Sequence, residues 1–239
     1  KSGFGPGMKA GGPNYVTQFM EFTDAVPARM NYIPSTPTLN SLCDALKAQM
    51  HPDANRIIAA ALSYERNQRE EFGARHDHFK LVGQDNVRRY LPAGSVRVRV
   101  HPSDTVFEIF GRVCAAHAVG CRVVVSSPPG LNAAAVTLLE NLTESWAGAI
   151  EFVEETDAEL VRAIRERQTD RVRYAAPDRA SLEVLRAGNE AGGCVLTLPV
   201  SAEGRLELLW YVHEQSISTD YHRYGNLGLR AAEARAEVL

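Results

Sequence analysis

The sequence predicts an α/β fold: a Rossmann-like parallel sheet with helices on both faces, preceded by a helical segment. Two observations support this prediction. Between residues 95 and 200, short valine-rich runs alternate with segments of helical period, and repeated strand–helix–strand units form parallel sheets with right-handed crossovers. The length of 239 residues allows one large domain or two small ones, with a sizeable core.

The residue pattern of the first forty residues predicts little regular secondary structure. Residues 5–16, "GPGMKAGGPNYV", hold four glycines and two prolines and indicate a specialised loop. An apolar stretch at 16–20 fits a short strand or the edge of a helix, and three prolines in 26–40 indicate a linker. From Ser41 to about Leu81 the spacing predicts one or two amphipathic helices, broken at 51–53 by proline.

The alternating part begins with "SVRVRV" at 95–100, whose strict period of two predicts a strand with one exposed face near a sheet edge. Residues 104–120 then predict a helix, with Asp104 as its cap and Gly120 as its stop. Further elements are expected in turn: strands at 121–127, 149–155, 170–176 and 194–200, and helices at 132–142, 156–167 and 179–188.

The C-terminal tail, residues 207–239, differs in composition and spacing from the alternating part. Residues 207–230 begin as an apolar strand and become aromatic and polar, and 229–239 predict a last helical piece. We therefore divide the chain into 1–40, 41–206 and 207–239.

Composition narrows the partners and the compartment. With 26 Lys and Arg against 29 Asp and Glu, the net charge of −3 gives no electrostatic reason to bind nucleic acid or an anionic membrane. No apolar run approaches the roughly 20 residues of a bilayer span, and no signal peptide is evident, so we expect a cytoplasmic protein. The cysteines lack paired spacing and are expected to be free, mostly buried thiols: Cys43, Cys114, Cys121 and Cys194.

Sheets of this kind commonly bind a dinucleotide, but this chain lacks the glycine-rich turn that would hold its pyrophosphate. The first strand runs into His101-Pro102-Ser103, and the second is followed by a single glycine, Gly130. Cys114 and His117 share a helical face and are expected in the core rather than in a nucleophilic pair. The triplet at 76–78, His-Asp-His, is interpreted as a solvated helix end rather than a metal site.

The segment 220–226 contains the densest cluster of side chains that could bind a partner or take part in catalysis. Its members are Asp220, Tyr221, His222, Arg223, Tyr224, Gly225 and Asn226. Aromatic and arginine anchors of this kind favour a tail that docks on another surface, while an active-site insertion remains open.

The opening of the chain resembles a known family. Lys9, Gly11, Gly12, Pro13 and Tyr15 match the C-terminal segment of the aldehyde dehydrogenase domain in L-glutamate γ-semialdehyde (Δ1-pyrroline-5-carboxylate) dehydrogenases. The resemblance implies that 1–40 are the end of a catalytic domain and a linker, and that this upstream domain is a partner. We accordingly expect residues 1–25 to be weakly anchored.

The remainder resembles the extra aldehyde-dehydrogenase-superfamily domain of long bifunctional proline utilization A enzymes. "RYLPAGSVRV" and "AVGCRVVVSSPPG" follow the order of strands in a dehydrogenase cofactor domain. The family oxidises proline with FAD and the resulting semialdehyde with NAD, so the resemblance implies both cofactors for a parent enzyme in proline catabolism to glutamate. It makes 41–206 the Rossmann-like domain and 207–239 a flap and a lid-like tail that closes the substrate channel.

This chain departs from the active members of the superfamily. Ser126 or Ser127 stands where they carry the lysine that contacts the adenosine ribose, and no oxyanion asparagine occupies 101–103. No glycine–serine phosphate loop follows 170–176, and no cysteine lies in the nucleophile motif. The resemblance therefore implies a domain that supports assembly and is inactive alone, with no cofactor of its own.

A second hypothesis stays open at this stage. A nucleotide-binding regulatory module, or a small enzyme using His222, Arg223 and Tyr224, is also compatible with the sheet and the tail. A pocket at the carboxyl ends of the strands that holds a phosphate would favour it, because doubly wound sheets bind ligands there. A homo-oligomer is compatible with either hypothesis.

Overall fold

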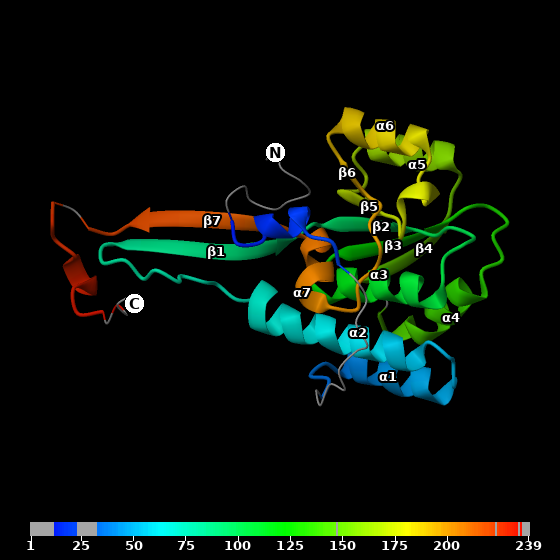
Figure 1. Ribbon diagram of the computed structural model, residues 1–239, viewed down its shortest axis with the longest axis horizontal. Coiled ribbons are helices and arrows are strands. Elements are labelled where there is room, and N and C mark those ends of the chain that lie inside the picture. The colour runs from blue at the N-terminus through cyan, green and yellow to red at the C-terminus, as the bar shows by residue number, and fades with distance from the viewer. Residues whose placement is uncertain (1–11, 23–32, 147, 223, 234, 236–239) are drawn as a thin grey trace.

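The structure is a computed structural model of the 239-residue chain. It describes residues 12–22, 33–146, 148–222, 224–233 and 235. Figure 1 shows a body built around a parallel sheet and a long two-stranded ribbon that projects from it.

The N-terminal part is helical. A 3₁₀ turn, η1 (Tyr15–Phe19), is followed by α1 (Pro37–Ala48) and α2 (Ala54–Asn67), which continues as a π-helical turn, η2 (Gln68–Phe72). The break at 51–53 is confirmed. The prediction of helix to about Leu81 is wrong, because the chain leaves the helix at Gly73 and runs back along the ribbon.

The central sheet has five parallel strands in the order β4-β3-β2-β5-β6. Its strands are β2 (Ser95–Arg99), β3 (Arg122–Ser127), β4 (Ile150–Glu154), β5 (Arg171–Arg173) and β6 (Cys194–Leu196). The crossover helices are α3 (Val106–Ala118), α4 (Ala134–Leu142), α5 (Asp157–Arg165) and α6 (Leu182–Ala191). The predicted fold class and the order of these elements are confirmed.

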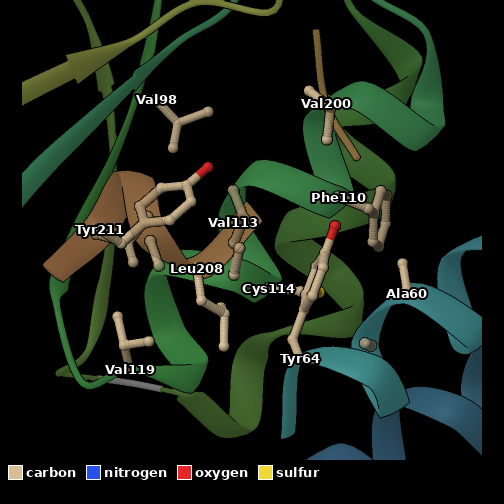
Figure 2. Close-up of a cluster of buried hydrophobic side chains, with 14 of the residues drawn as sticks. Ala60, Tyr64, Val98, Phe110, Val113, Cys114, Val119, Val200, Leu208 and Tyr211 are labelled. Atoms are coloured by element: carbon tan, nitrogen blue, oxygen red, sulfur yellow. The ribbon is translucent and has the colours of Figure 1, made fainter. Parts of the chain in front are cut away.

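Helices cover both faces of the sheet (Figure 1). On one face, α1 to α4 enclose the larger apolar core, in which Tyr64, Phe110, Val113 and Leu208 pack closely (Figure 2). On the other face, α5 and α6 cover a smaller cluster around Leu160 and Val184. Burial of this apolar surface is the main source of stability.

The prediction that 95–100 lies near a sheet edge is wrong, because β2 is the middle strand. The error came from interpreting alternating arginines as solvent-facing. In the structure the side chains of Arg97 and Arg99 are almost completely buried, and each pairs with a carboxylate from the segment after β4. A strand can therefore alternate in period two and still be covered on both faces, provided that its charges are paired.

The ribbon consists of β1 (Gln84–Pro92) and β7 (Val212–Asp220), which pair antiparallel over nine residues each. Sequence reasoning missed β1. The apolar start of 207–230 is α7 (Gly204–Glu207) followed by a 3₁₀ turn, η5 (Leu208–Tyr211), rather than a strand. Leu208 and Tyr211, three residues apart, are both fully buried. Helical turns place residues at this spacing on one face, whereas a strand would turn them to opposite faces.

The predicted last helix is also wrong over the residues that the structure describes. Only a 3₁₀ turn, η6 (Gly228–Arg230), forms there, and the segment after it folds back toward β1. Within the described parts of the chain, no helix is long and apolar enough to cross a membrane.

Candidate functional site

An open cleft of about 520 Å³ lies at the carboxyl edge of the parallel sheet. Its walls come from the segments that follow the central strands: Arg99 to His101 after β2, Pro128 and Pro129 after β3, Thr156 and Asp157 after β4, and Tyr174 and 178–181 after β5. Doubly wound sheets bind their ligands at this edge. The cleft is therefore the candidate site, and its chemistry depends on which groups are free to meet a ligand.

The turn after β2 is where a dinucleotide fold presents backbone N–H groups to a pyrophosphate. Here these groups already have partners. The N–H of His101 donates to Asp104 at 3.0 Å, and the N–H of Thr105 donates to Glu108 at 2.7 Å. In return, the Thr105 hydroxyl accepts from the Glu108 N–H at 3.2 Å.

This reciprocal pattern is a capping box, so Thr105 is the cap of α3. The prediction of Asp104 as cap is wrong. Gly120, with φ +85°, does follow the end of the helix, as expected for a glycine stop.

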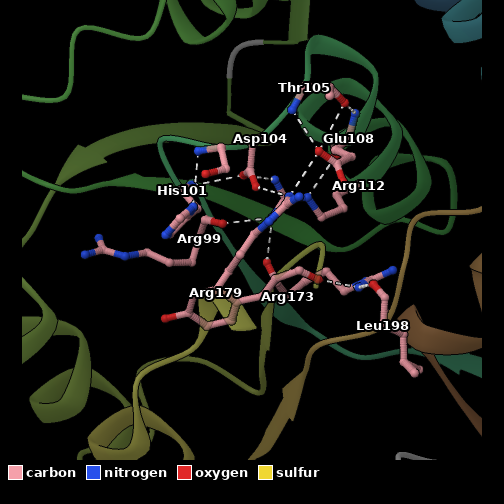
Figure 3. A network of polar contacts seen from close by, with 11 residues as sticks. Arg99, His101, Asp104, Thr105, Glu108, Arg112, Arg173, Arg179 and Leu198 are labelled. Atoms are coloured by element: carbon pink, nitrogen blue, oxygen red, sulfur yellow. Dashed lines mark hydrogen bonds and ion pairs between the residues drawn. The ribbon is translucent and has the colours of Figure 1, made fainter. Parts of the chain in front are cut away.

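Asp104 lies at the centre of an ion-pair network beneath the cleft (Figure 3). Its fully buried carboxylate pairs with the fully buried guanidinium of Arg112 and, at 2.6 Å, with Arg179. Arg179 also reaches Glu108 at 3.0 Å. Burial raises the pKa of Glu108, but hydrogen bonds from Arg179 and Thr105 outweigh it and hold the pKa below its ordinary value.

Arg112 crosses the sheet edge and ties neighbouring strands together. Its guanidinium donates to the carbonyl of Arg99 in β2 at 2.8 Å and to that of Arg173 in β5 at 3.0 Å. Arg173 in turn pairs with the buried carboxylate of Glu207 at 2.9 Å. Because buried charges are tolerated only when paired and hydrogen-bonded, this chain of contacts is an integrated structural unit.

On the other face of the sheet, Arg99 fills the floor of the cleft. It donates to the hydroxyl of Ser126 at 2.9 Å, to the carbonyl of Glu155 at 2.8 Å and to Asp157 at 2.8 Å. Ser126 is thus a fully buried acceptor for Arg99, and it is one of the two positions, 126 and 127, where the resemblance would place the ribose-contacting lysine.

These contacts do not fit a bound dinucleotide. The N–H groups of His101, Thr105 and Glu108 are occupied by side chains. The positive charges of Arg99 and Arg179 are matched by Asp157 and Asp104. A pyrophosphate would have to displace partners that are already well placed, so the cleft as it stands does not fit NAD.

Thiol chemistry is not supported at the three buried cysteines; Cys194, which like them forms no disulfide, is half-buried. Burial raises the pKa of Cys114 to about 12 and those of Cys43 and Cys121 to about 11, and a protonated thiol is a poor nucleophile. His117 stacks on Trp146 with ring centroids 3.9 Å apart, and burial lowers its pKa. The interpretation of Cys114 and His117 as core residues is confirmed for the buried Cys114. His117 is only half-buried, so for this residue the interpretation was wrong.

The triplet at 76–78 lies beside the ribbon rather than at a helix end, so that interpretation was wrong. His76 forms an isolated bridge with Arg88 of β1, and its ring stacks on His78. Among the described residues, no group of three His, Cys, Asp or Glu side chains could hold a metal ion.

The N-terminal family motif lies at the base of the ribbon, far along the chain from the cleft. Lys9 and Gly11 are outside the described residues. The carbonyl of Gly12 accepts from the N–H of Tyr15 at 3.0 Å, Pro13 is exposed, and the ring of Tyr15 packs edge-on against Phe19.

The anchor of this segment is Asn14, which sequence reasoning missed. It is 1% exposed; its amide donates to the Tyr90 hydroxyl at 2.6 Å and to Glu214 at 3.1 Å, and it accepts from Arg205 at 2.7 Å. Weak anchoring is thus wrong for Asn14, whereas Val16, Phe19, Met20 and Phe22 are exposed as expected.

The tail residues gather at the tip of the ribbon, away from the cleft (Figure 1). Asp220 accepts from Gln84 at 2.8 Å, and Nδ1 of His222 lies 3.1 Å from the carbonyl of Gly83. Tyr224 is exposed, Gly225 has φ +80°, and Asn226 accepts from the N–H of Gly228. Arg223 lies outside the described residues.

A clasp formed by Arg230, Arg235 and Asp85 holds the end of this tail. Both guanidinium groups bind Asp85, at 2.7 and 2.6 Å, and both lie near the ring of Tyr221, Arg230 directly over it. Their hydrogen bonds hold the pKa of Asp85 well below its ordinary value. The tail is therefore fastened to β1 of its own ribbon.

The most informative residues of the site were not predicted. A signal was present: arginine alternates with valine in both "SVRVRV" and "DRVRYAA". Two arginine-bearing strands in a sheet covered on both faces require an equal supply of buried acceptors. Glu155 and Asp157 supply them for β2, and Glu207 and the backbone carbonyl of Val212 supply them for β5, from segments far apart in the sequence.

Comparisons with known proteins can now be set beside this geometry. No protein-family model and no curated protein matches the chain. Among solved structures, proline utilization A (PutA) from Corynebacterium freiburgense is similar over 93% of this chain, with 24% identity and a TM-score of 0.58. Aldehyde dehydrogenases from Burkholderia cenocepacia (putative; 19% identity, TM-score 0.52) and Bacillus cereus (15%, 0.54) each match 66% of it.

At these identities the likeness shows the fold: the chain contains a Rossmann-like α/β domain of the kind found in aldehyde dehydrogenases. It spans 18% of the length of the PutA chain and 36–37% of the two dehydrogenases. The sheet therefore shares the fold of those domains, and the arginines that line the cleft at its edge are paired with the chain's own carboxylates.

Proposed function

We propose that this chain is a non-catalytic assembly domain of a Δ1-pyrroline-5-carboxylate (L-glutamate γ-semialdehyde) dehydrogenase that acts in proline catabolism to glutamate. The observation that carries the proposal is the ion-pair network of Asp104, Arg112 and Arg179 at the place where an active relative would bind its cofactor. The similarity to PutA along 93% of the chain supports the choice of parent enzyme. NAD and FAD then belong to the parent rather than to this domain.

The exposed apolar side chains at the base of the ribbon support a role in assembly. Apolar side chains of η1 and the adjoining segment, Val16, Phe19, Met20 and Phe22, are 46–74% exposed at the base of the ribbon. Exposed patches of this kind are covered by a partner in working assemblies. In the proposal that partner is the upstream aldehyde dehydrogenase domain, and the ribbon with its tail closes the passage of the semialdehyde, which a water-poor channel would protect.

The test is reconstitution. A catalytic dehydrogenase domain of this type, expressed without the present chain, is mixed with the chain and followed by size-exclusion chromatography and by semialdehyde oxidation. The proposal predicts co-elution and a higher oxidation rate, and a Phe19→Ser Met20→Ser variant is expected to lose both. Leu182→Ser, at an equally exposed residue on α6, is the matched control. Failure of the wild-type chain to co-elute would contradict the proposal.

One observation favours a second candidate. The cleft at the carboxyl edge is large enough for part of a nucleotide and presents two arginines, Arg99 and Arg179. A regulatory nucleotide-binding module would use them once Asp157 and Asp104 released them. Titration with ATP and with inorganic phosphate distinguishes the candidates: saturable binding lost in Arg179→Ala favours the module, and no binding favours the assembly domain.

A further inference from the structure

One buried guanidinium of the sheet has no carboxylate partner. Arg171 of β5 is 2% exposed, and its guanidinium donates to the backbone carbonyls of Trp210 and Val212, the latter at 2.7 Å. Nδ1 of His213 lies 3.4 Å from the same group. Among the described residues Arg171 forms no ion pair, whereas every other arginine of β2 and β5 pairs with a carboxylate. A buried positive charge of this kind favours an anion beside it.

The side chain next to Arg171 in the sheet is that of Cys194. The two residues are register partners in the parallel pair of β5 and β6, so their side chains leave the same face of strands that lie about 4.8 Å apart. Burial lowers the pKa of Arg171, and Cys194 makes the largest contribution that opposes this shift. Because the attraction is mutual, the guanidinium favours the thiolate of Cys194 over its thiol.

Cys194 is also the cysteine that solvent reaches. All four cysteines lie in the described part of the chain; Cys43, Cys114 and Cys121 are buried, whereas Cys194 is half-buried. It begins β6, an outer strand of the sheet, directly after the exposed Gly193. Cys121 interacts with the same guanidinium, but burial dominates and raises its pKa to about 11. A neighbouring positive charge and access to solvent therefore coincide at Cys194.

We propose that Cys194 is a site of oxidation by hydrogen peroxide, and that its oxidation loosens the base of the ribbon. The thiolate sulfur attacks one oxygen of the peroxide, so that an S–O bond forms as the O–O bond breaks. The sulfur gives up two electrons and becomes a sulfenic acid. The departing hydroxide takes up the proton that the thiol released, which gives water.

The effect on the ribbon follows from what Arg171 holds. Its bonds to the carbonyls of Trp210 and Val212 fasten η5 and the first residue of β7 to the central sheet. A sulfenic acid at Cys194 places a new acceptor oxygen beside the guanidinium, in competition with these carbonyls. Oxidation should therefore weaken the attachment of β7 to the body. The inference does not depend on the proposed function, because it rests on contacts within this chain.

The first test is alkylation of the 239-residue chain by iodoacetamide at pH 7, followed cysteine by cysteine with mass spectrometry. Cys194 should react about threefold faster in the folded chain than in the urea-unfolded chain, because the thiolate is the nucleophile. The three buried cysteines should react only after unfolding. Slower alkylation of Cys194 in the folded chain would show that its environment does not favour the thiolate, and would overturn the inference.

The second test adds hydrogen peroxide together with dimedone, which traps sulfenic acids. Cys194 should carry the label in the folded chain. Arg171→Gln should slow this labelling about threefold, since the neighbouring charge is lost, whereas Arg122→Gln, at an exposed arginine of β3, should not. If Arg171→Gln fails to fold, the comparison of the folded and unfolded wild-type chain decides the point. Label spread evenly over all four cysteines would overturn the proposed site.

The link to the ribbon is measured by hydrogen exchange after peroxide treatment without dimedone. Exchange at residues 212–214 should become faster in the wild-type chain, because local opening of β7 is then easier. Cys194→Ser, treated in the same way, should show no change. Unchanged exchange in a wild-type chain whose Cys194 is oxidised would overturn the proposed effect on the ribbon.

Discussion

The body and the ribbon of this chain use charge in opposite ways. In the body, Arg112 of α3 and Arg173 of β5 are fully buried and matched to the fully buried carboxylates of Asp104 and Glu207. At the tip of the ribbon, by contrast, the paired side chains of Asp85 and Arg230 keep 25% and 35% of their surface exposed. Buried pairs cost several kcal/mol when one partner is removed, whereas exposed pairs contribute little. The contrast teaches that the charges beneath the cleft belong to the folding core, whereas those at the tip of the ribbon lie outside it.

The largest effect is expected in the body, where Asp104→Ala leaves Arg112 buried without its carboxylate. We expect a loss of about 3–5 kcal/mol in the free energy of unfolding, measured by urea denaturation. Asp178→Ala is the matched control, because Asp178 lines the same cleft but is exposed, and it should change stability by less than about 0.5 kcal/mol. Similar losses for the two variants would remove the contrast between buried and exposed charge.

A smaller loss is expected at Gly204, where the body meets the element that leads into β7. A Cβ atom there would lie 2.5 Å from the backbone carbonyl oxygen of Ser63 in α2. Gly204→Ala should therefore destabilise the chain by about 1–3 kcal/mol through overpacking. Gly193→Ala is the control, because the added Cβ there meets only ordinary contacts. Both variants are followed by thermal unfolding. A melting curve of Gly204→Ala that coincided with that of Gly193→Ala would refute the packing argument.

Acid should loosen the base of the ribbon through Glu71. Burial raises the pKa of Glu71, but hydrogen bonds from Arg88 and Tyr90 outweigh it and bring the pKa below its ordinary value. The folded state therefore binds this proton less readily than the unfolded state. The stabilisation is present above pH about 4.3 and is lost as the pH falls through the folded pKa.

Stability curves between pH 6 and pH 3 measure this contribution. Glu71→Gln should be less stable than the wild type at pH 6 and should lose less stability on acidification. Glu154→Gln, at an exposed carboxylate in the last residue of β4, serves as the control and should keep the wild-type slope. An unchanged slope in Glu71→Gln would show that this carboxylate is not the titrating group.

The smallest effect on global stability is expected at the tail. Asp85→Asn weakens the clasp of Arg230 and Arg235, so trypsin should cleave after these arginines faster while the melting temperature stays within experimental error. Glu151→Gln, which breaks an exposed pair with Arg122 in the body, should leave tail cleavage unchanged. A clear drop in melting temperature for Asp85→Asn would place the clasp among the structural pairs instead.

The sequence was sufficient for the elements whose signal is local. The strand at 121–127 and the helices at 132–142 and 156–167 could be predicted because apolar spacing and short connections report directly on burial. The position of β2 could not, since Arg97 and Arg99 are buried by partners more than fifty residues away. The same reason hid Asn14 and β1, whose roles depend on contacts with Glu214 and β7 at the far end of the chain.

The central claim is that the chain's own charges occupy the cleft where a relative would bind NAD. Isothermal titration calorimetry of the 239-residue chain with NAD tests it most directly, with an NAD-binding aldehyde dehydrogenase as the positive control. The account predicts no saturable heat up to millimolar NAD. Micromolar one-to-one binding that disappears in Arg179→Ala would contradict it.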